Sequence, residues 1–235
     1  MELIWQGLVD ALTLLARRDA ATLRVAGLSL AVSGLATALS ALVGVPLGAA
    51  LALWRFPGRG LLAGLVNTGM GLPPVVVGLG VSLLLWRSGP LGPLNLIYTP
   101  AAMVLAQFAV AAPLAAGLTR SALGLLDADL VGALRVDGAT ERRMAWEMVR
   151  AAPAQVLVAL AAAFGRAISE VGASLMVGGN ILNQTRVLTT AITLETSRGE
   201  FARALALGIL LLALAFLVNA TLLRGARGMA GAGLS

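Results

Sequence analysis

Two ionisable side chains interrupt a stretch of sequence that is otherwise apolar. Arg166 and Glu170 lie four residues apart within residues 154–177, and a continuous helix would place them on one face. An ionisable residue in a membrane-length apolar segment is a candidate for function, because the bilayer core penalises charge. The same spacing also suits a structural ion pair that locks two helices together. Under both interpretations we expect the two charges to neutralise each other.

A second group of charged residues gathers in residues 127–153, although only 12% of the chain is charged. The pattern predicts two short helices, because Thr140 can cap the second of them. Asp137 and Gly138 should end the first helix. Glycine is the residue that allows both a positive φ and close approach of a partner to the backbone. Gly138 is therefore expected to have either a positive φ or a close contact.

The second of these helices carries a stripe of apolar side chains that includes Met144 and Met148, with Trp146 nearby. One interpretation is a solvated loop that merely joins two spans, because runs of charge are usually solvated. The other is a docking surface, since short amphipathic helices insert into grooves on soluble partners. Exposed Met and Trp side chains favour docking, because interfaces use such apolar anchors.

The elements that must position these residues are membrane-spanning helices. The chain is 59% hydrophobic, and several uncharged runs exceed the roughly 20 residues that a helix needs to cross a bilayer. The sequence therefore predicts an all-α, polytopic membrane protein. Residues 1–22 should form an amphipathic segment on the membrane interface, and residues 224–235 a tail. We place the spans near residues 25–54, 61–86, 100–118, 154–177 and 201–223.

Proline and glycine mark two features of the predicted spans. Pro73 and Pro74 must kink or interrupt the second span, since proline removes a backbone donor. An interruption would suit a helix that is broken along a pathway, where freed backbone groups line a cavity. Gly44 with Gly48, and Gly60 with Gly64, permit close helix packing. That spacing is common in glycine-rich membrane helices, so it is only a weak indication of contacts between two copies.

Three residue types are missing, and their absence limits the chemistry. The chain has no Cys, no His and no Lys. Disulfides, zinc sites, thiolate or histidine catalysis, Schiff bases and a Walker-type phosphate loop are therefore excluded. We expect no catalytic residue and no bound metal or cofactor. The net charge of +6 reflects arginines at membrane edges rather than binding to nucleic acid.

The charged insert resembles a known family. The run GALRVDGA at residues 132–139, followed by a helix and Pro153, resembles the cytoplasmic EAA loop of permease subunits of ATP-binding-cassette importers. In that family the loop forms a coupling helix that docks into a cleft on the ATPase subunit. Two departures are that Gly132 replaces the motif's Glu and that Pro153 comes about two residues late. The resemblance implies docking residues at Ala133, Asp137, Gly138, Ala139, Met144 and Met148.

Three further runs narrow the resemblance. GLPPVVVGLG, GRAISEVGASLMVGGNI and TRVLTTAITLETSRGEF are together similar to the permeases of tungstate-type importers, and the second also to molybdate and sulfate permeases. This implies the type I importer permease fold and an oxyanion substrate, tungstate first and molybdate second. Asn180 and Arg186 would then lie externally, where they contact the anion or its binding protein. The pathway residues would be Pro73, Pro74, Arg166 and Glu170, and we hypothesise that opening of the ion pair frees Arg166 to face the anion.

The resemblance also implies partners and a location. A second copy of the chain, two ATPase subunits that bind ATP and Mg²⁺, and an external substrate-binding protein would complete the assembly in a bacterial or archaeal inner membrane. Residues 127–153 would be cytoplasmic, which gives a slight excess of arginine on the inside. The alternative is a secondary transporter or channel that works without an ATPase. That alternative explains the spans but not a charged insert with DGA at its turn.

Overall fold

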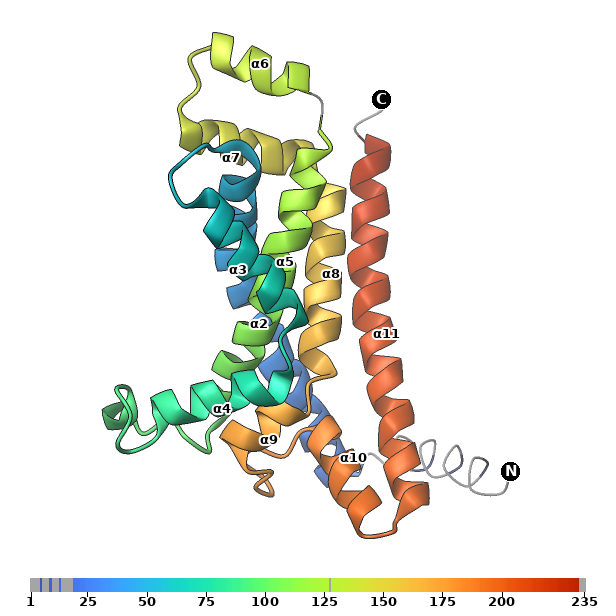
Figure 1. Ribbon diagram of the computed structural model, residues 1–235. Helices are drawn as coiled ribbons and strands as arrows, with labels where there is room; N and C mark the ends of the chain where they lie inside the picture. Colours follow the sequence, from blue (N-terminus) through green and yellow to red (C-terminus); the bar gives the residue numbers. More distant parts are fainter. Residues whose placement is uncertain (1–4, 6–8, 10–12, 14–18, 127, 233–235) are drawn as a thin grey trace. The chain divides into compact units, whose positions relative to one another are not determined.

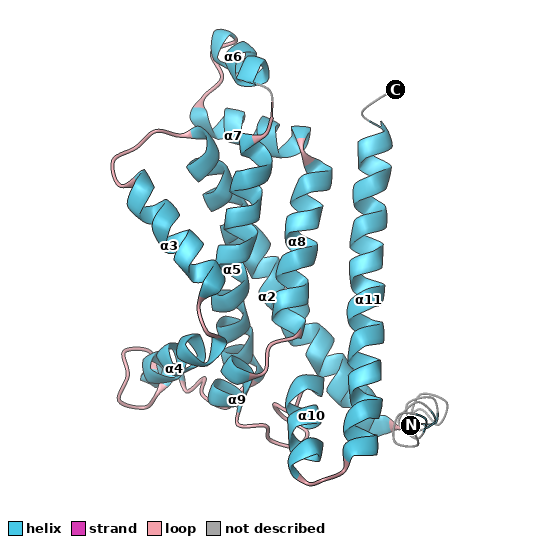
Figure 2. Cartoon of the chain, turned by 45° about the vertical axis from the view of Figure 1, so that its right-hand side comes forward, coloured by secondary structure: helices cyan, strands magenta, loops and turns pink. Residues whose placement is uncertain are grey.

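The described part of the chain is helical throughout its regular structure. The computed structural model describes residues 5, 9, 13, 19–126 and 128–232, and within them Figure 1 and Figure 2 show helices joined by loops. Most of the predicted interfacial segment, residues 1–22, lies outside the described residues. The elements are α2 (Ala20–Leu53), α3 (Arg59–Gly71), α4 (Pro74–Leu85), the 3-10 turn η1 (Gly92–Leu94), α5 (Pro100–Gly124), α6 (Ala128–Val136), α7 (Glu141–Ala151), α8 (Pro153–Ile168), α9 (Gly172–Gly178), α10 (Leu188–Ser197) and α11 (Phe201–Ala232).

The helices group into two compact units. The first unit contains α4, α9 and α10, and the second contains α3, α6, α7 and most of α8. The long helices α2, α5 and α11 each contribute residues to both units. The ranges are Met1–Ala36, Pro73–Ala109 and Arg166–Leu217 for the first unit, and Thr37–Leu72, Val110–Gly165 and Val218–Ser235 for the second.

Three of the described helices are long and apolar enough to cross a membrane: Ala20–Leu53, Pro100–Gly124 and Phe201–Arg227. They cover the first, third and fifth predicted ranges. The number rises to five if α3 with α4, and α7 with α8, each count as one interrupted span. Helix α11 continues to Ala232, so the described residues of the predicted tail prolong the last helix.

The proline pair interrupts the second predicted span rather than merely kinking it. Helix α3 ends at Gly71, and Leu72 and Pro73 both have extended backbone. Pro74 then starts α4 as its first residue, a position where the missing N–H donor costs nothing. Because a residue before proline disfavours the helical region, Leu72 and Pro73 are both driven out of it. Of the two predicted outcomes, a kink or an interruption, the structure has the interruption.

The fourth predicted span is not continuous, which corrects the range of residues 154–177. Helix α8 ends at Ile168, and α9 begins only at Gly172. Polar side chains compete with the helix here. The Ser169 hydroxyl donates to the Arg166 carbonyl over 3.2 Å, and the Glu170 carboxylate accepts a hydrogen bond of 2.8 Å from the Ala173 N–H.

Residues 178–199, which include Asn180 and Arg186, contain helix α10. Leu188 and Ala191 of this helix form a buried cluster with Leu207 of α11, and Val25 of α2 packs against it. The Leu188 N–H also donates to the Ser29 hydroxyl over 2.8 Å. These contacts join α10 to α2 and α11 within the first unit.

A buried amide holds three helices together in the first unit. The Gln107 side chain on α5 accepts from the Ser33 hydroxyl of α2 over 3.0 Å and donates to the Ser174 hydroxyl of α9 over 3.2 Å. Both ends of the amide are thus satisfied, as burial of a polar group requires. Helix α4 lies directly against α9, since a Cβ on Gly78 would come within 2.6 Å of the Ala173 Cα.

The glycine pair of α2 packs within the chain. A Cβ on Gly44 would lie 2.8 Å from the Ala115 Cβ, and one on Gly48 would lie 2.5 Å from the Ala116 carbonyl oxygen. Helices α2 and α5 therefore touch backbone to backbone in the second unit, so this pair does not serve contacts between copies. No described atom of another element lies within 4 Å of a Cβ built on Gly60 or Gly64.

Candidate functional site

The charged insert folds into two short helices joined by a tight turn, as predicted. Helices α6 and α7 lie side by side in both ribbon views (Figures 1 and 2). Thr140 caps α7, and its hydroxyl accepts a hydrogen bond from the Arg143 N–H over 3.3 Å. Glu141 lies in the first turn of α7 and Arg150 in its last. Both charges oppose the helix dipole and stabilise the helix.

Gly138 ends α6 in the left-handed region, with φ of 70°. The Ala139 N–H donates to the Leu134 carbonyl over 3.0 Å, and the Gly138 N–H donates to the Arg135 carbonyl over 3.1 Å. This pair of bonds is the Schellman motif, which glycine closes without a steric penalty. A Cβ on Gly138 would meet no described atom within 4 Å. The glycine is therefore required by its backbone angle and not by a close contact inside the chain.

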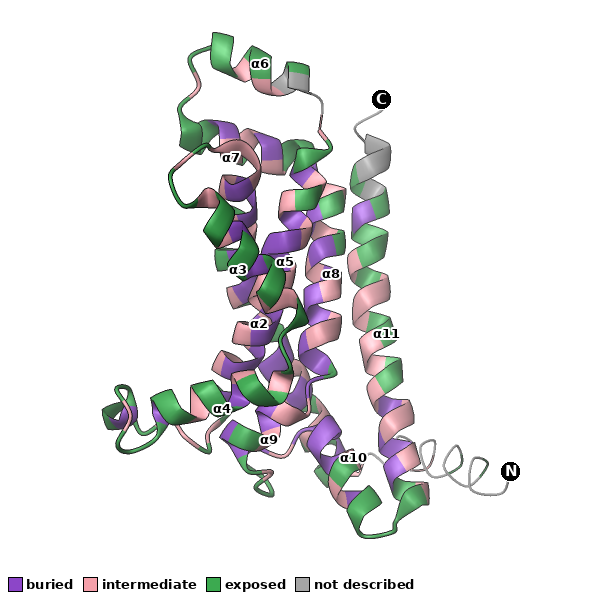
Figure 3. Cartoon of the chain, in the orientation of Figure 1, coloured by how far each residue is buried: buried purple, intermediate pink, exposed green. Residues whose placement is uncertain are grey.

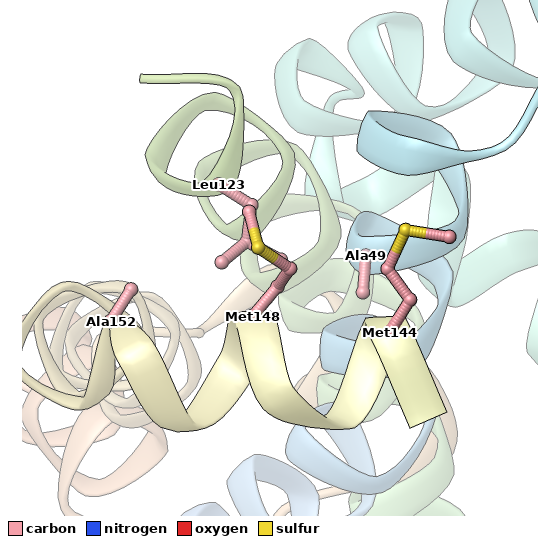
Figure 4. Packing of buried hydrophobic residues seen from close by; sticks show 5 residues of the cluster. All are labelled: Ala49, Leu123, Met144, Met148 and Ala152. Carbon is pink, nitrogen blue, oxygen red and sulfur yellow. The ribbon is translucent and has the colours of Figure 1, made fainter. Parts of the chain in front are cut away.

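The prediction that Met144 and Met148 form a docking surface is wrong. Their exposed fractions are 2% and 0%, and they form one buried cluster with Ala49 of α2 and Leu123 of α5 (Figure 4). A stripe of apolar residues shows that one face of a helix is buried, but it does not identify the partner. Here the partner is the chain itself, and the two methionines attach α7 to the ends of α2 and α5.

The surface of the insert lies elsewhere. Ala133, Asp137 and Gly138 are exposed, and most of the described side chains of α6 are exposed or half-buried (Figure 3). Val136 is 89% exposed and Trp146 is 61% exposed. The docking residues predicted from the sequence did not include Val136. Ala139, the remaining predicted docking residue, is half-buried.

Helix α7 turns sharply into α8. The two helix axes differ by 83° across Ala152, which is itself buried in the cluster with Met148. Pro153 begins α8 and cannot donate to the preceding turn, so α7 cannot continue in the same direction. The insert is thus joined directly, without a loop, to the apolar helix α8.

Arg166 and Glu170 do not share a helix face, which corrects the sequence prediction. Arg166 lies in the last turn of α8, whereas Glu170 lies in the loop after it and caps α9. Both belong to the described residues, and their side chains form no ion pair there. The carboxylate of Glu170 is buried and its hydrogen bond goes to backbone, while Arg166 is half-buried.

The interruptions in the second and fourth predicted spans come together in the first unit. A Cβ on Gly172, at the start of α9, would lie 2.7 Å from a methyl carbon of Val75, the residue after Pro74. The Glu170 carbonyl also accepts from the Thr189 hydroxyl of α10 over 2.9 Å. Two helix breaks therefore adjoin each other, although they are far apart in sequence.

Asn180 and Arg186 are also brought together. The Arg186 Nε donates to the Asn180 side-chain oxygen over 3.2 Å, and a terminal guanidinium nitrogen donates to the Asn180 carbonyl over 3.3 Å. Asn180 adopts a φ of 52°, which asparagine tolerates better than most residues. Part of the donor capacity of Arg186 is therefore used to hold its own loop.

A known family accounts for the helices and the insert together. The family described as "Binding-protein-dependent transport system inner membrane component" matches residues 44–227, most of the chain. The chain belongs to this family. It is thus a membrane-spanning component of such a transport system, in the inner membrane. Membership decides against a transporter or channel that works alone.

Individual permeases resemble most of the chain. A probable anion ABC transporter permease of Haloferax volcanii is 45% identical over 201 residues, which cover 83% of this chain and 87% of that protein. A tungstate uptake system permease of Peptoclostridium acidaminophilum is 38% identical over 222 residues, 94% and 97% of the two chains.

Solved structures show the same fold. In inward-facing structures of the MetNI methionine ABC transporter, one chain superposes with a TM-score of 0.73 at 20% identity, covering 89% of this chain and 96% of that one. A chain of a bacterial alginate ABC transporter has a TM-score of 0.67 at 20% identity, covering 87% and 78%. The predicted type I importer permease fold is confirmed.

Proposed function

We propose that this family member is the permease subunit of an importer for a tetrahedral oxyanion, tungstate first and molybdate second. The observation that carries the proposal is the likeness over nearly the full length to the tungstate permease of Peptoclostridium acidaminophilum, together with the higher identity to a probable anion permease. Both proteins match this chain across its membrane helices and not only across the insert.

The proposal assigns coupling to the exposed part of the insert. Ala133, Asp137 and Gly138 would contact the ATPase, with Val136 beside them as an apolar anchor. Helix α7 would transmit the force, because Met144 and Met148 bind it to the bundle. ATP and Mg²⁺ would be bound by two ATPase subunits, and this chain would bind no cofactor and catalyse no reaction. Rigid-body rocking of helices would then change access to the pathway.

The proposal gives the remaining candidates roles in the path of the anion. A second copy of the chain would complete the pathway, and a substrate-binding protein would deliver the anion near Asn180 and Arg186. The adjoining breaks at Pro74 and Glu170 would lie along the pathway, because interrupted backbone at membrane depth suits a cavity wall. Arg166 would face the anion, and the absence of an ion pair with Glu170 in the described chain supports this role.

Reconstituted uptake tests the function. Proteoliposomes containing the chain, its ATPase and its binding protein should accumulate labelled tungstate only when ATP is present. Unlabelled molybdate should compete more strongly than sulfate. Uptake that persists without the ATPase would contradict the coupling, and ATP-driven uptake of a neutral solute in place of the anions would contradict the substrate class.

A further inference from the structure

Three arginines line one pocket in the second unit. The pocket has a volume of about 330 Å³ and lies where the α2–α3 connection meets α5. No carboxylate contributes to its wall. Its lining residues are Arg55, Phe56, Arg59, Gly60, Ala63 and Arg120.

Backbone contacts fix two of the three arginines. The Arg59 guanidinium donates through two nitrogens to the Leu51 carbonyl near the end of α2, over 2.9 Å and 2.7 Å. Arg120 is held close to α2 because Gly48 lets the two backbones approach, and a Cβ on Gly48 would come within 3.0 Å of the Arg120 nitrogen. The arginines therefore converge through tertiary packing rather than through flexible side chains alone.

Two of the three arginines of the pocket, Arg55 and Arg120, have no partner for their charge in the described chain. Arg120 is half-buried and, in the described chain, its guanidinium forms neither a hydrogen bond nor an ion pair; the same holds for exposed Arg55. Helix α3 begins at the pocket, and its N-cap residue Gly58 has no side chain to cap it. Clustered cations beside an uncapped helix start are unfavourable unless an anion neutralises them.

Solvation at the membrane edge is the simpler explanation for arginines near helix ends. It accounts for each arginine separately. It does not account for the convergence of three arginines, from a loop, a helix start and the last turns of another helix, on one pocket without a carboxylate.

We infer that this arginine pocket, formed by Arg55, Arg59 and Arg120, binds a phosphate-type tetrahedral oxyanion. Guanidinium groups recognise such anions because their paired N–H donors match two oxygens at once. The anion comes either from the headgroup of an anionic phospholipid or from the aqueous phase. The inference goes beyond the proposed function, since it concerns a site other than the pathway and does not depend on which substrate is carried.

Binding measurements on the purified full chain test the pocket with two probes. Native mass spectrometry measures the binding of phosphatidylglycerol, and phosphatidylcholine serves as the zwitterionic reference. The thermal unfolding temperature in lipid-poor detergent measures the binding of inorganic phosphate. Arg120→Gln is the main variant, because the Arg120 guanidinium forms no hydrogen bond or ion pair in the described chain. Arg224→Gln, an exposed arginine on α11, is the control with the same change in charge.

Arg120→Gln should weaken binding of one probe about tenfold, the effect of losing a charge-assisted hydrogen bond. Arg120→Lys should restore part of it, since a point charge attracts the anion without paired donors. If Arg120→Gln weakens only the binding of phosphatidylglycerol, the ligand is a lipid headgroup. If it weakens the binding of inorganic phosphate, the ligand is a free oxyanion. Equal binding of both probes by the unmodified chain and Arg120→Gln would overturn the inference, as would an equal loss in Arg224→Gln.

Discussion

Single residues set the turn of the insert and the break after α8. Gly138 closes the Schellman motif at a φ of 70°, and Glu170 directs its carboxylate to a backbone N–H instead of to Arg166. Both roles follow from local backbone geometry. The residues can therefore be tested by changes that alter this geometry and leave the bundle intact.

Replacing Gly138 by valine should uncouple transport from ATP hydrolysis. A β-branched residue at positive φ is strained by about 1–2 kcal/mol, so the α6–α7 turn should open while the spans stay folded. We expect normal membrane levels and lost uptake in the reconstituted assay. Gly138→Asn is the matched control, because asparagine tolerates this backbone region. Normal uptake by the valine variant would show that the turn is not required for coupling.

Glu170→Leu should destabilise the chain by about 1 kcal/mol through loss of the helix cap. Glu170→Gln should retain most of the stability, because its amide oxygen still accepts from the Ala173 N–H. Since Arg166 and Glu170 form no ion pair, the effects of Arg166→Leu and Glu170→Leu should add in the double variant. Thermal unfolding of the unmodified chain, the two single leucine variants and the double variant measures whether the effects add. Rescue of either single variant by the double change would instead reveal a pair formed in another conformation.

Helices α2 and α5 are the elements on which the second unit is organised. They approach each other closely at Gly44 and Gly48. Near their ends, both helices pack against Met144 and Met148 of α7. The same approach brings Arg120 toward the α2–α3 connection, where the arginine pocket lies. Changes at these contacts should therefore affect whole elements rather than single side chains.

Met148→Ala should loosen α7 from the bundle. Truncation of a fully buried methionine costs about 2–5 kcal/mol, because the lost contacts leave a cavity beside Leu123. Trp146→Ala is the control on the same helix, and its exposed ring should contribute less than about 1 kcal/mol. Denaturation midpoints and protease cleavage in the α6–α7 turn measure the difference. Equal stability of the two variants would contradict the anchoring role of Met148.

Gly48→Ala and Gly64→Ala should have opposite effects. An added Cβ at Gly48 meets the Ala116 carbonyl, so α2 and α5 must separate at a cost of about 1–3 kcal/mol. At Gly64 the Cβ meets no described atom within 4 Å. Alanine there should stabilise α3 by about 0.5–1 kcal/mol through helix propensity. Unfolding midpoints of the two variants test this, and tolerance of Gly48→Ala would refute backbone contact between the helices.

The orientation of the whole molecule in the membrane can be measured with single cysteines, since the chain has none of its own. Arg143→Cys should resist an impermeant thiol reagent in intact cells, because the insert should face the cytoplasm. Asn183→Cys should react, because the loop before α10 should face outward. Both positions are exposed in the structure, so burial does not explain protection. The reverse pattern would place the insert outside and exclude docking to a cytoplasmic ATPase.

The sequence predicts those features of the molecule that depend on local chemistry. Pro73 and Pro74 break a helix because the residue before each proline disfavours the helical region. Thr140 caps the helix that follows it. The break after Ile168 was missed because Ser169 and Glu170 are compatible with a helix until their side chains find backbone partners. Helix α10 was missed because its polar residues conceal a buried face that includes Leu188 and Ala191.

The sequence alone determined that the chain is a helical membrane protein with a charged two-helix insert, because hydropathy, proline and glycine act over a few residues. Only the tertiary structure decided which way the apolar stripe of α7 faces, and it buries Met144 and Met148 inside the chain. It also brought Arg55, Arg59 and Arg120 to one pocket. Such contacts depend on how closely α2 and α5 approach, and no stretch of sequence specifies that distance by itself.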